Sequence, residues 1–577
     1  MLTFVDFETF KYDWLCVLIN PIKKTETVIV NNPDELRQFY EENKDTIYVG
    51  YNIRGYDQWI FKAILAGFNP YEMNEHIITK DKKGHEFSSV LRQYPLTIYD
   101  VAQFGASLKQ LEAMQGHSIY ESDVDFRLDR KLTQAELDET IKYCRNDVQE
   151  TANIFLKKKA DFDVQMELIH EFNLPLSCIS KTQTQLTAEI LGAKRRECTD
   201  EFNLNFPKYL NKIKKYKHIV DWFKQFKTDK NFTDEEKKKI YEQKLDIEVA
   251  GVPHTFAWGG LHAAILKYFG KGIFLHIDVS QYYPSLMVGH NYFSRAVSEE
   301  GKQRYDMMRR ESIRLKAFPE LANKRGGYKL CNNKAYGAMK DKYNSLCDPL
   351  MANNICVTGQ LALLLLIEML EPHCKLIQSN TDGLIVKLDS LDKYELIDDI
   401  CYEWECMTGV SLAFDPIITK IYQKDVNNYL FVNEDDEVES KGAYVKKLNA
   451  LDYDLPIVNK ALKEYLINGT PIETTINNCN DLIEYQKIVK LSSKFKWVEH
   501  NNTKYTNKCY RVFASTDDTD GIIYKCKDDK RDKFANTPEN CFIENGDIRG
   551  LSVPDKLNKS YYIDLAYDRL RQFGEVA

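Results

Sequence analysis

The chain has 577 residues, of which 44% are hydrophobic and 12% aromatic, and its formal net charge is −8. This composition excludes a disordered chain, and the length corresponds to about four domains of ordinary size. The negative charge does not exclude a nucleic-acid partner, because phosphate binding depends on local patches of cations. Fourteen cysteines without a Cys-x-x-Cys pair argue against zinc fingers and a disulfide scaffold, and favour reduced thiols in the cytoplasm.

Neither an export signal nor a membrane partner is expected. The first residues include two acids, Asp6 and Glu8, where a signal peptide would have basic residues. The longest apolar run, Leu361 to Ile367, is too short to cross a bilayer and predicts a buried helix.

The elements predicted in chain order describe a multidomain α/β protein. Up to about residue 160, short apolar runs alternate with amphipathic segments, and polar helices follow to about residue 250. A second apolar section begins near Ile273, and after about residue 450 the pattern predicts a polar, loop-rich region. The predicted strands include 2–7, 47–51 and 96–99; the predicted helices include 57–65 and 134–155.

Acidic residues recur on three elements of the first section. Asp6 and Glu8 alternate with apolar residues on a strand, so both carboxylates point to one face. Asp57 follows a turn and opens a helix, and Asp147 shares a helix face with Tyr143, four residues earlier. Any one of these acids alone would be read as a helix cap or a surface charge, but the ordered set favours a shared site.

This ordered set resembles the DEDD-type 3′→5′ exonucleases. The resemblance implies that the four acids hold two Mg²⁺ or Mn²⁺ ions and that Tyr143 orients the attacking water. Asn52, in the turn before Asp57, would contact DNA. Ser107 and Leu108 match the motif with which related proofreading domains hold single-stranded primer ends.

A second set begins at Asp278, which ends an apolar strand and precedes Tyr282-Tyr283-Pro284. Here the chain resembles family B DNA polymerases, specifically the compact ones of bacteriophages and mobile elements. The resemblance implies that Asp278 and the Val279 carbonyl bind metal and that Tyr283 excludes a ribose 2′-hydroxyl. Gln281 and Tyr282 replace the family's usual Ser-Leu, which predicts altered hydrogen bonds around the triphosphate.

The segment from Lys329 to Gly337 resembles the fingers motif of the same family. Lys329, Asn333 and Tyr336 share one helix face, which would present an ammonium to the triphosphate and a ring to the nascent base pair. Arg325 would add a second cation one turn earlier, but Gly326-Gly327 is expected to interrupt that turn. On a predicted partner helix, 303–318, Arg310 and Arg314 fit a solvated face as well as a phosphate contact.

Two segments compete for the third palm motif, a hairpin with an acid at its tip. Asp382 lies between apolar strands, but the segment there has Asn380 in place of the first acid of the Asp-Thr-Asp motif. Asp520 lies in a segment that matches this motif more closely. We choose Asp382, because its order and spacing fit. The substitution at Asn380 leaves metal affinity and metal preference open. Weaker matches to the family's linker and primer-contact motifs add four DNA-binding residues: Gly259, Gly260, Lys441 and Tyr444.

The resemblance implies an RNase H-like exonuclease domain and a right-hand polymerase with palm, fingers and thumb. The predicted domains are exonuclease (1–160), helical extension (161–255), palm (256–302 and 346–450), fingers (303–345) and thumb (451–577). The implied ligands are primer-template DNA, dNTPs and two Mg²⁺ or Mn²⁺ ions per site. A clamp, a helicase or other replication proteins are possible partners of an otherwise monomeric enzyme in the host cytoplasm.

Several alternatives stay open at this stage. The intervals from Asp278 to Lys329 and from Gly337 to Asp382 leave no room for the insertions of protein-primed members. We therefore expect an ordinary primer, and protein-primed or primer-independent synthesis is the alternative within the family. A nuclease with a degenerate palm and a DNA-binding protein with residual motifs are the others, and Asn380 is their best support.

Overall fold

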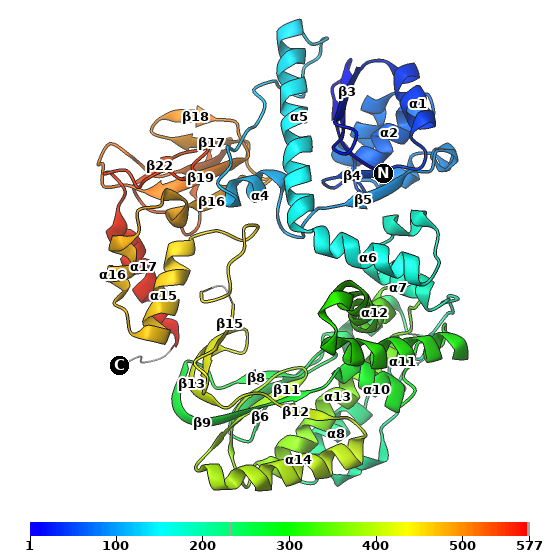
Figure 1. The fold of residues 1–577 in the computed structure, drawn as a ribbon, viewed down its shortest axis with the longest axis vertical. Helices are drawn as coiled ribbons and strands as arrows, with labels where there is room; N and C mark the ends of the chain where they lie inside the picture. Colours follow the sequence, from blue (N-terminus) through cyan, green and yellow to red (C-terminus); the bar gives the residue numbers. More distant parts are fainter. Residues whose placement is uncertain (230–231, 443, 574–577) are drawn as a thin grey trace. The chain divides into compact units, whose positions relative to one another are not determined.

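The computed structural model describes residues 1–229, 232–442 and 444–573 (Figure 1). The chain divides into two compact units, each assembled from segments far apart in sequence. Unit 1 comprises Met1–Lys181, Leu448–Val458 and Glu473–Ile563, and unit 2 comprises Thr182–Lys447, Asn459–Ile472 and the end of the chain from Asp564. The predicted mixed α/β, multidomain character is confirmed. The finer domain boundaries stay predictions.

The N-terminal part of unit 1 is a five-stranded sheet of order β3-β2-β1-β4-β5. Strand β1 pairs antiparallel with β2 and parallel with β4, and α2 and α5 pack against it (Figure 1). The strands are β1 (Leu2–Thr9), β2 (Trp14–Asn20), β3 (Thr25–Val30), β4 (Ile47–Gly50) and β5 (Thr97–Asp100). The helices are α1 (Pro33–Glu42), α2 (Asp57–Leu65), α3 (Pro70–Asn74), α4 (Leu108–Met114), α5 (Gln134–Lys157) and α6 (Lys159–Glu171).

Local sequence explains why these elements start where they do. Thr133 and Glu136 form a reciprocal capping box that satisfies backbone amides at the start of α5. Ser107 and Gln110 do the same for α4. The predicted strands and helices of this region are confirmed, and α2 has the predicted bounds.

The C-terminal part of unit 1 contains two small antiparallel sheets, β16-β19-β22 and β18-β17-β20-β21. The strands are β16 (Lys487–Lys490), β17 (Trp497–His500), β18 (Thr503–Tyr505), β19 (Cys509–Ala514), β20 (Tyr524–Lys527), β21 (Lys530–Lys533) and β22 (Cys541–Ile543). The expectation of a loop-rich region is therefore wrong here. These strands are only three to six residues long, and lysines interrupt their apolar runs, so the period-two pattern is too short to recognise.

Unit 2 is organised around one sheet that has ten strands within the described residues. Its order is β15-β14-β13-β9-β11-β10-β8-β7-β6, and β12 pairs with β9 beside this path. The strands are β6 (Leu245–Val249), β7 (Val252–Phe256), β8 (His262–Ala264), β9 (Tyr268–Val279), β10 (Lys375–Ser379), β11 (Gly383–Leu388), β12 (Leu412–Phe414), β13 (Ile418–Asp425), β14 (Asn428–Asn433) and β15 (Val438–Lys441). The long strand β9 lies between β13 and β11, near the middle of the sheet (Figure 1).

The helices of unit 2 include α13, which carries the apolar run noted above and packs against α10, α12 and α14, while α7 and α11 pack against α12. They are α7 (Gln183–Ile190), α8 (Lys217–Lys224), α9 (Asp234–Tyr241), α10 (Tyr282–Gly289), α11 (Glu299–Arg314), α12 (Ala322–Lys340), α13 (Pro349–Leu370) and α14 (Tyr394–Thr408). Helix α13 is long and apolar enough to span a membrane, but 94% of its most apolar window is buried in the protein. It is therefore a core helix, as predicted.

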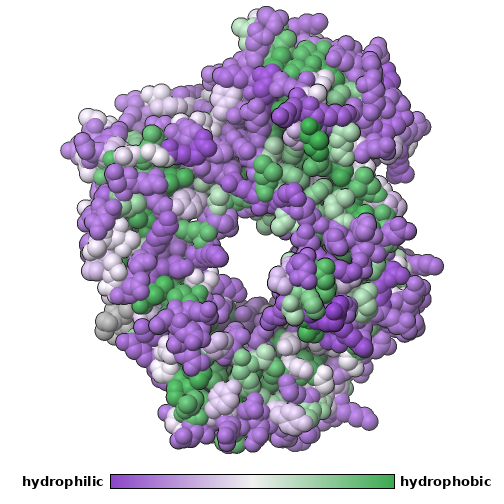
Figure 2. All heavy atoms as spheres, in the orientation of Figure 1, coloured by the Kyte–Doolittle hydropathy of each residue, from purple (hydrophilic) through white to green (hydrophobic). Residues whose placement is uncertain are grey.

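Three further helices complete the described chain: α15 (Pro456–Asn468), α16 (Ile472–Asn478) and α17 (Lys559–Leu570). On the face shown in Figure 2, hydrophilic residues cover most of the surface. This agrees with a chain in which 28% of the residues are charged.

Candidate active sites

The first site is built on β1, where Asp6 and Glu8 point to the same face of the sheet. A hydrogen bond from the Phe7 amide to Asp57 Oδ1, 3.1 Å long, joins the start of α2 to this strand. Asp57 is buried, and it is the first residue of its helix. The three carboxylates therefore come from two elements that are locked to each other through the backbone.

Helix α5 supplies the fourth carboxylate. Cys144 donates its thiol to the Asp6 carbonyl at 3.4 Å, which fixes α5 against β1. One turn further along, the buried Asp147 accepts a hydrogen bond from Lys109 Nζ at 2.5 Å. The ligand atoms of Asp6, Glu8 and Cys144 all lie within 4.8 Å of one another. Asp57 and Asp147 lie close enough to raise the pKa of both Asp6 and Glu8 by charge repulsion, so the structure clusters the four acids that the sequence singles out.

The electrostatics of this cluster favour a bound cation. Burial raises the pKa of all four carboxylates, and the charges of neighbouring carboxylates add to the shift for Asp6, Glu8 and Asp57. The pKa of Asp57 rises to about 7. Carboxylate oxygens are the ligands that Mg²⁺ and Mn²⁺ prefer, so the donor set fits two-metal binding. The cluster can hold divalent cations once its protons are lost.

Lys109 is a functional candidate that the sequence interpretation missed. It is buried, contacts Asp147 and Glu112, and its ammonium lies 4.9 Å from the centre of the Tyr143 ring. Burial and neighbouring charges also raise the pKa of Tyr143 above its ordinary value. The one sequence signal was indirect, since Lys109 follows the predicted primer-end motif Ser107-Leu108 on the same short helix.

The turn before Asp57 is held by Asp100 at the end of β5. Asp100 accepts hydrogen bonds from the backbone amides of Asn52 and Arg54, at 2.9 and 3.0 Å. Asn52 has a left-handed backbone, with φ of 60°, and its side chain is exposed. Its side chain is therefore accessible to a ligand, and its role in DNA binding stays a prediction.

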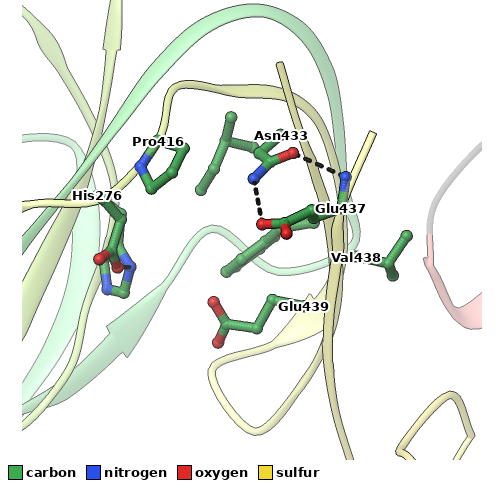
Figure 3. A pocket seen from close by; sticks show the side chains of 9 residues that line it. His276, Pro416, Asn433, Glu437, Val438 and Glu439 are labelled. Atoms are coloured by element: carbon green, nitrogen blue, oxygen red, sulfur yellow. Dashed lines mark hydrogen bonds and ion pairs between the residues drawn. The ribbon is translucent and has the colours of Figure 1, made fainter. Parts of the chain in front are cut away.

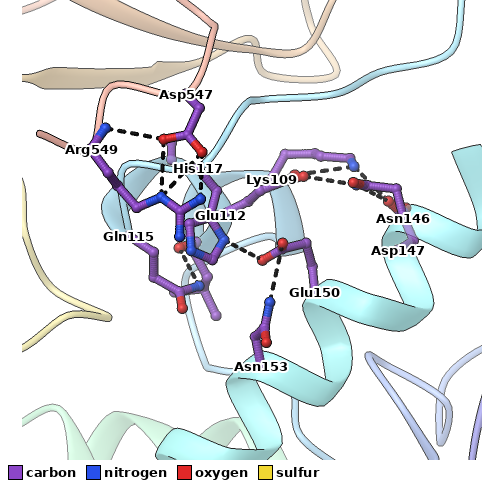
Figure 4. Close-up of polar contacts among 12 residues, drawn as sticks. Lys109, Glu112, Gln115, His117, Asn146, Asp147, Glu150, Asn153, Asp547 and Arg549 are labelled. Carbon is purple, nitrogen blue, oxygen red and sulfur yellow. Dashed lines mark hydrogen bonds and ion pairs between the residues drawn. The ribbon is translucent and has the colours of Figure 1, made fainter. Parts of the chain in front are cut away.

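The segment that carries Lys109 is anchored to the β16-β19-β22 sheet of the same unit. The Arg511 guanidinium is fully buried and donates to the carbonyls of Ala113 and His117, at 2.9 and 2.8 Å. Gln486 donates to the Met114 carbonyl. Figure 4 shows the polar contacts that surround this segment, including the His117–Glu150 pair at 2.8 Å. The C-terminal sheet therefore fixes the helix that contacts Asp147.

The second site lies on the large sheet of unit 2. Asp278 is near the end of β9, and its cross-strand partner on β11 is Gly383, the residue after Asp382. The Val279 amide donates to the Asp382 carbonyl at 2.6 Å. Burial, and then the Asp382 charge, raises the pKa of Asp278 to about 6. The two acids chosen from the sequence are thus neighbours, although about a hundred residues separate them.

The competing acid, Asp520, belongs to unit 1 and lies in a turn rather than at the tip of a two-stranded hairpin. It accepts hydrogen bonds from Ser515 Oγ at 2.6 Å and from Lys556 Nζ at 3.1 Å. These contacts give Asp520 a structural role in the C-terminal sheets.

Asn380 lies two residues before Asp382, in the turn between β10 and β11. Its Oδ1 accepts from the Thr381 amide at 2.9 Å and lies 3.0 Å from His262 Nδ1. A Cβ on Gly260 would lie 2.4 Å from Thr381 Oγ1, so only glycine fits against this hairpin tip. The neighbouring Gly259 carbonyl accepts from Gln360 at 2.8 Å. The two predicted DNA-binding glycines thus hold the chain close to the hairpin.

Helix α12 presents the predicted nucleotide-binding residues. Lys329 and Asn333 are exposed, and the Tyr336 ring packs 4.5 Å from the Tyr283 ring of α10, centre to centre. Arg325 Nε donates to the Ser312 carbonyl of α11 at 3.1 Å. The expected interruption at Gly326-Gly327 is wrong, because α12 is continuous from Ala322 and buries Gly327 in its packing.

Five other residues named in the sequence analysis are placed as follows. Lys441 ends β15, is exposed, and lies 6.0 Å from the Tyr429 ring centre. Tyr444 donates to Gln572 at 3.2 Å and lies beneath the Lys424 ammonium, 4.8 Å from the ring centre. Gln281 has a left-handed backbone, φ 46°, and donates to Ser312 at 2.8 Å, so it links β9 to α11. Arg310 and Arg314 pair with Asp306 and Glu311 on their own helix.

Comparison with known proteins gives limited information. No protein-family model matches the chain, and no curated protein matches it. Among solved structures it is similar to the family B DNA polymerase from the hyperthermophilic archaeon Pyrobaculum calidifontis. The TM-score is 0.41 and the identity 13%, over 100% of this chain and 78% of the other. A likeness at this level decides neither family nor activity.

Proposed function

We propose that the chain is a template-directed DNA polymerase with a 3′→5′ proofreading exonuclease. The observation that carries the proposal is the juxtaposition of Asp278, on β9, with Asp382, just before β11, in a chain whose other unit clusters four more carboxylates. Two separate carboxylate clusters are what two phosphoryl-transfer reactions on one DNA end would require.

In the palm reaction, the primer 3′-oxygen attacks the α-phosphate of a dNTP and pyrophosphate leaves. Divalent cations held by Asp278, Asp382 and the Val279 carbonyl would stabilise the attacking and leaving oxygens of this reaction. The four acids of unit 1 would hold the cations that do the same in the exonuclease reaction. The exposed Lys329 ammonium binds the triphosphate, with Asn333 on the same face. The packed rings of Tyr283 and Tyr336 form a wall for the sugar and the nascent base pair, which disfavours a 2′-hydroxyl.

In the exonuclease reaction, water attacks the terminal phosphodiester of a frayed primer. Tyr143, whose high pKa keeps its hydroxyl protonated, donates a hydrogen bond that orients this water. Lys109 holds Asp147 in place and compensates part of the cluster's negative charge. Ser107, Leu108 and Asn52 bind the single-stranded end, while Lys441 and Tyr444 bind the primer in the polymerase mode.

The proposal extends to the biological setting. The compact size of the motif intervals suits an ordinary primer and the replication of phage or mobile-element DNA in a host cytoplasm. A 5′-labelled primer annealed to a template, incubated with Mg²⁺ or Mn²⁺, tests the core of the proposal. It should lengthen with dNTPs and shorten without them.

A nuclease with a degenerate palm is the second candidate, and one observation favours it. The Asn380 amide faces His262, so the hairpin tip carries one acid instead of two. Shortening of the primer in every metal, with extension in none, would select this candidate over the polymerase.

A further inference from the structure

His276 lies beside the palm acids, although no motif includes it. It is two residues before Asp278 on β9, so both side chains point to the same face of the sheet. A Cβ on Gly383 would lie 3.4 Å from His276 Nε2 and 3.4 Å from Asp278 Oδ1. The glycine therefore leaves open one small space that both ligand-type atoms border.

Asp415 orients the imidazole. His276 Nδ1 lies 2.8 Å from Asp415 Oδ2, and the Asp415 amide donates to the His276 carbonyl at 3.2 Å. In the neutral imidazole, Nδ1 carries the proton that is donated to the carboxylate, and Nε2 keeps its lone pair on the side of Asp278. Histidines that bind metals usually have this arrangement, in which a carboxylate fixes the tautomer and raises the basicity of the ligand nitrogen.

The pair lines a cavity of about 260 Å³ on unit 2, together with Phe431, Asn433 and Glu439 (Figure 3). The imidazole is only partly buried, so it can move toward an ion without disrupting a packed core. Asp278 and Asp382 are the two acids at the tip of the sheet, and Asn380 stands where the family's motif has its first acid.

We infer that His276 Nε2 is an additional ligand of the palm metal ion and shifts the metal preference of this site from Mg²⁺ toward Mn²⁺. The inference rests on the proposed function, because it concerns the same palm site. Mg²⁺ binds oxygen ligands almost exclusively, whereas Mn²⁺, a first-row transition metal, binds both carboxylate oxygen and imidazole nitrogen. A site with one acid replaced by an amide and one imidazole added therefore loses affinity for Mg²⁺ and gains affinity for Mn²⁺.

The test measures metal binding separately from catalysis. Mn²⁺ and Mg²⁺ affinities are measured by calorimetry on the full chain carrying Asp6→Ala and Glu8→Ala, which removes the exonuclease ions. His276→Ala is compared with Asp415→Asn and with a matched control, His218→Ala, whose imidazole is exposed on α8. Electron spin-echo spectroscopy of bound Mn²⁺ reports directly whether an imidazole nitrogen is coordinated.

His276→Ala should raise the Mn²⁺ Kd at least about tenfold, change the Mg²⁺ Kd less than about twofold, and remove the nitrogen signal. Asp415→Asn should raise the Mn²⁺ Kd by about tenfold, as expected for loss of an orienting carboxylate. Mn²⁺ binding that is as unaffected by His276→Ala as by His218→Ala would overturn the inference.

Primer extension tests the proposed function independently of the metal-binding result. His276-dependent Mn²⁺ binding in a chain that never extends a primer supports the inference and overturns the polymerase. Primer extension with His276-independent Mn²⁺ binding overturns the inference and leaves the polymerase intact.

Discussion

The two carboxylate sites of this chain compensate their negative charge in different ways. In unit 1, four acids from three elements share a buried space with the Lys109 ammonium, which contacts Asp147 at 2.5 Å. In unit 2, Asp278 is half-buried and Asp382 is exposed, and the predicted cations lie on the separate helix α12. The first site contains its own cation, whereas at the second the neighbouring charge that acts most strongly on Asp278 is another carboxylate, Asp382.

The difference also concerns how each site is held. The first site is fixed through long-range contacts, including the hydrogen bonds that Arg511 donates to the segment that carries Lys109. The second is fixed mainly by the register of β9 and β11. We therefore expect the exonuclease site to be sensitive to distant substitutions and the palm site to its own strands alone.

The largest expected effect separates the two candidates for the third palm motif. Asp382→Ala should reduce primer extension by at least about 1000-fold, because it removes one of two carboxylates that hold the catalytic ions. Asp520→Ala, the matched control, should leave the extension rate within about twofold and lower stability instead. A reversal of these results would move the palm site to the C-terminal sheets.

A similar loss is expected at the other site. Asp57→Asn preserves the hydrogen-bonding shape at the start of α2 but removes a buried ligand charge, so exonuclease rates should fall by about 1000-fold. Extension of a matched primer should be unchanged. Equal loss of both activities would show that the two sites are not independent.

The next largest effect is expected on the stability of unit 1 when the buried Arg511 is substituted. Arg511→Met should destabilise unit 1 by about 3–5 kcal/mol in denaturant unfolding, since it leaves several buried carbonyls without a donor. Arg549→Met is the control: this exposed arginine pairs with Asp547, and the loss should stay below about 1 kcal/mol. Proofreading should decline more than extension in the Arg511 variant, and an equal decline would argue against the anchoring of α4 by this residue.

The smallest effect is a dependence of stability on pH. A carboxyl whose pKa is raised on folding binds more protons in the native state, so the metal-free protein loses stability as pH rises from about 4 through 7. Asp57 contributes at most about 4 kcal/mol, and the half-buried Asp278, at about 6, contributes less. Thermal unfolding in EDTA between pH 5 and 7.5 should show this decline.

Two comparisons check the origin of that decline. Asp57→Asn should flatten it, and Mn²⁺ at pH 7.5 should restore the unfolding temperature, because the ion replaces the lost protons. A flat profile in the unsubstituted protein would contradict the clustering of four acids.

The sequence was sufficient where local patterns decide structure. The alternation around Asp6, the turn before Asp57 and the amphipathic pattern from Gln134 predicted β1, α2 and α5, and ordered motifs led to Asp382. It was insufficient where distant segments decide. Nothing local to Lys109 shows that Asp147 will be its partner, and nothing local to Arg511 shows that it binds the end of α4.

The secondary-structure predictions also failed where local patterns were not sufficient. The helix α12 continues through Gly326-Gly327 because tertiary packing stabilises it beyond its intrinsic propensity. The seven short strands between Lys487 and Ile543 were missed because each is only three to six residues long, too short for a recognisable period-two pattern.

The most direct test of the central claim is the behaviour of one labelled primer-template with two variants. Asp6→Ala/Glu8→Ala should extend the primer with dNTPs but fail to shorten it without them. Asp278→Ala should shorten it but fail to extend it. This double dissociation is what two independent carboxylate sites predict. Loss of both activities in either variant, or extension in neither the variants nor the unsubstituted protein with Mg²⁺ or Mn²⁺, would contradict the account.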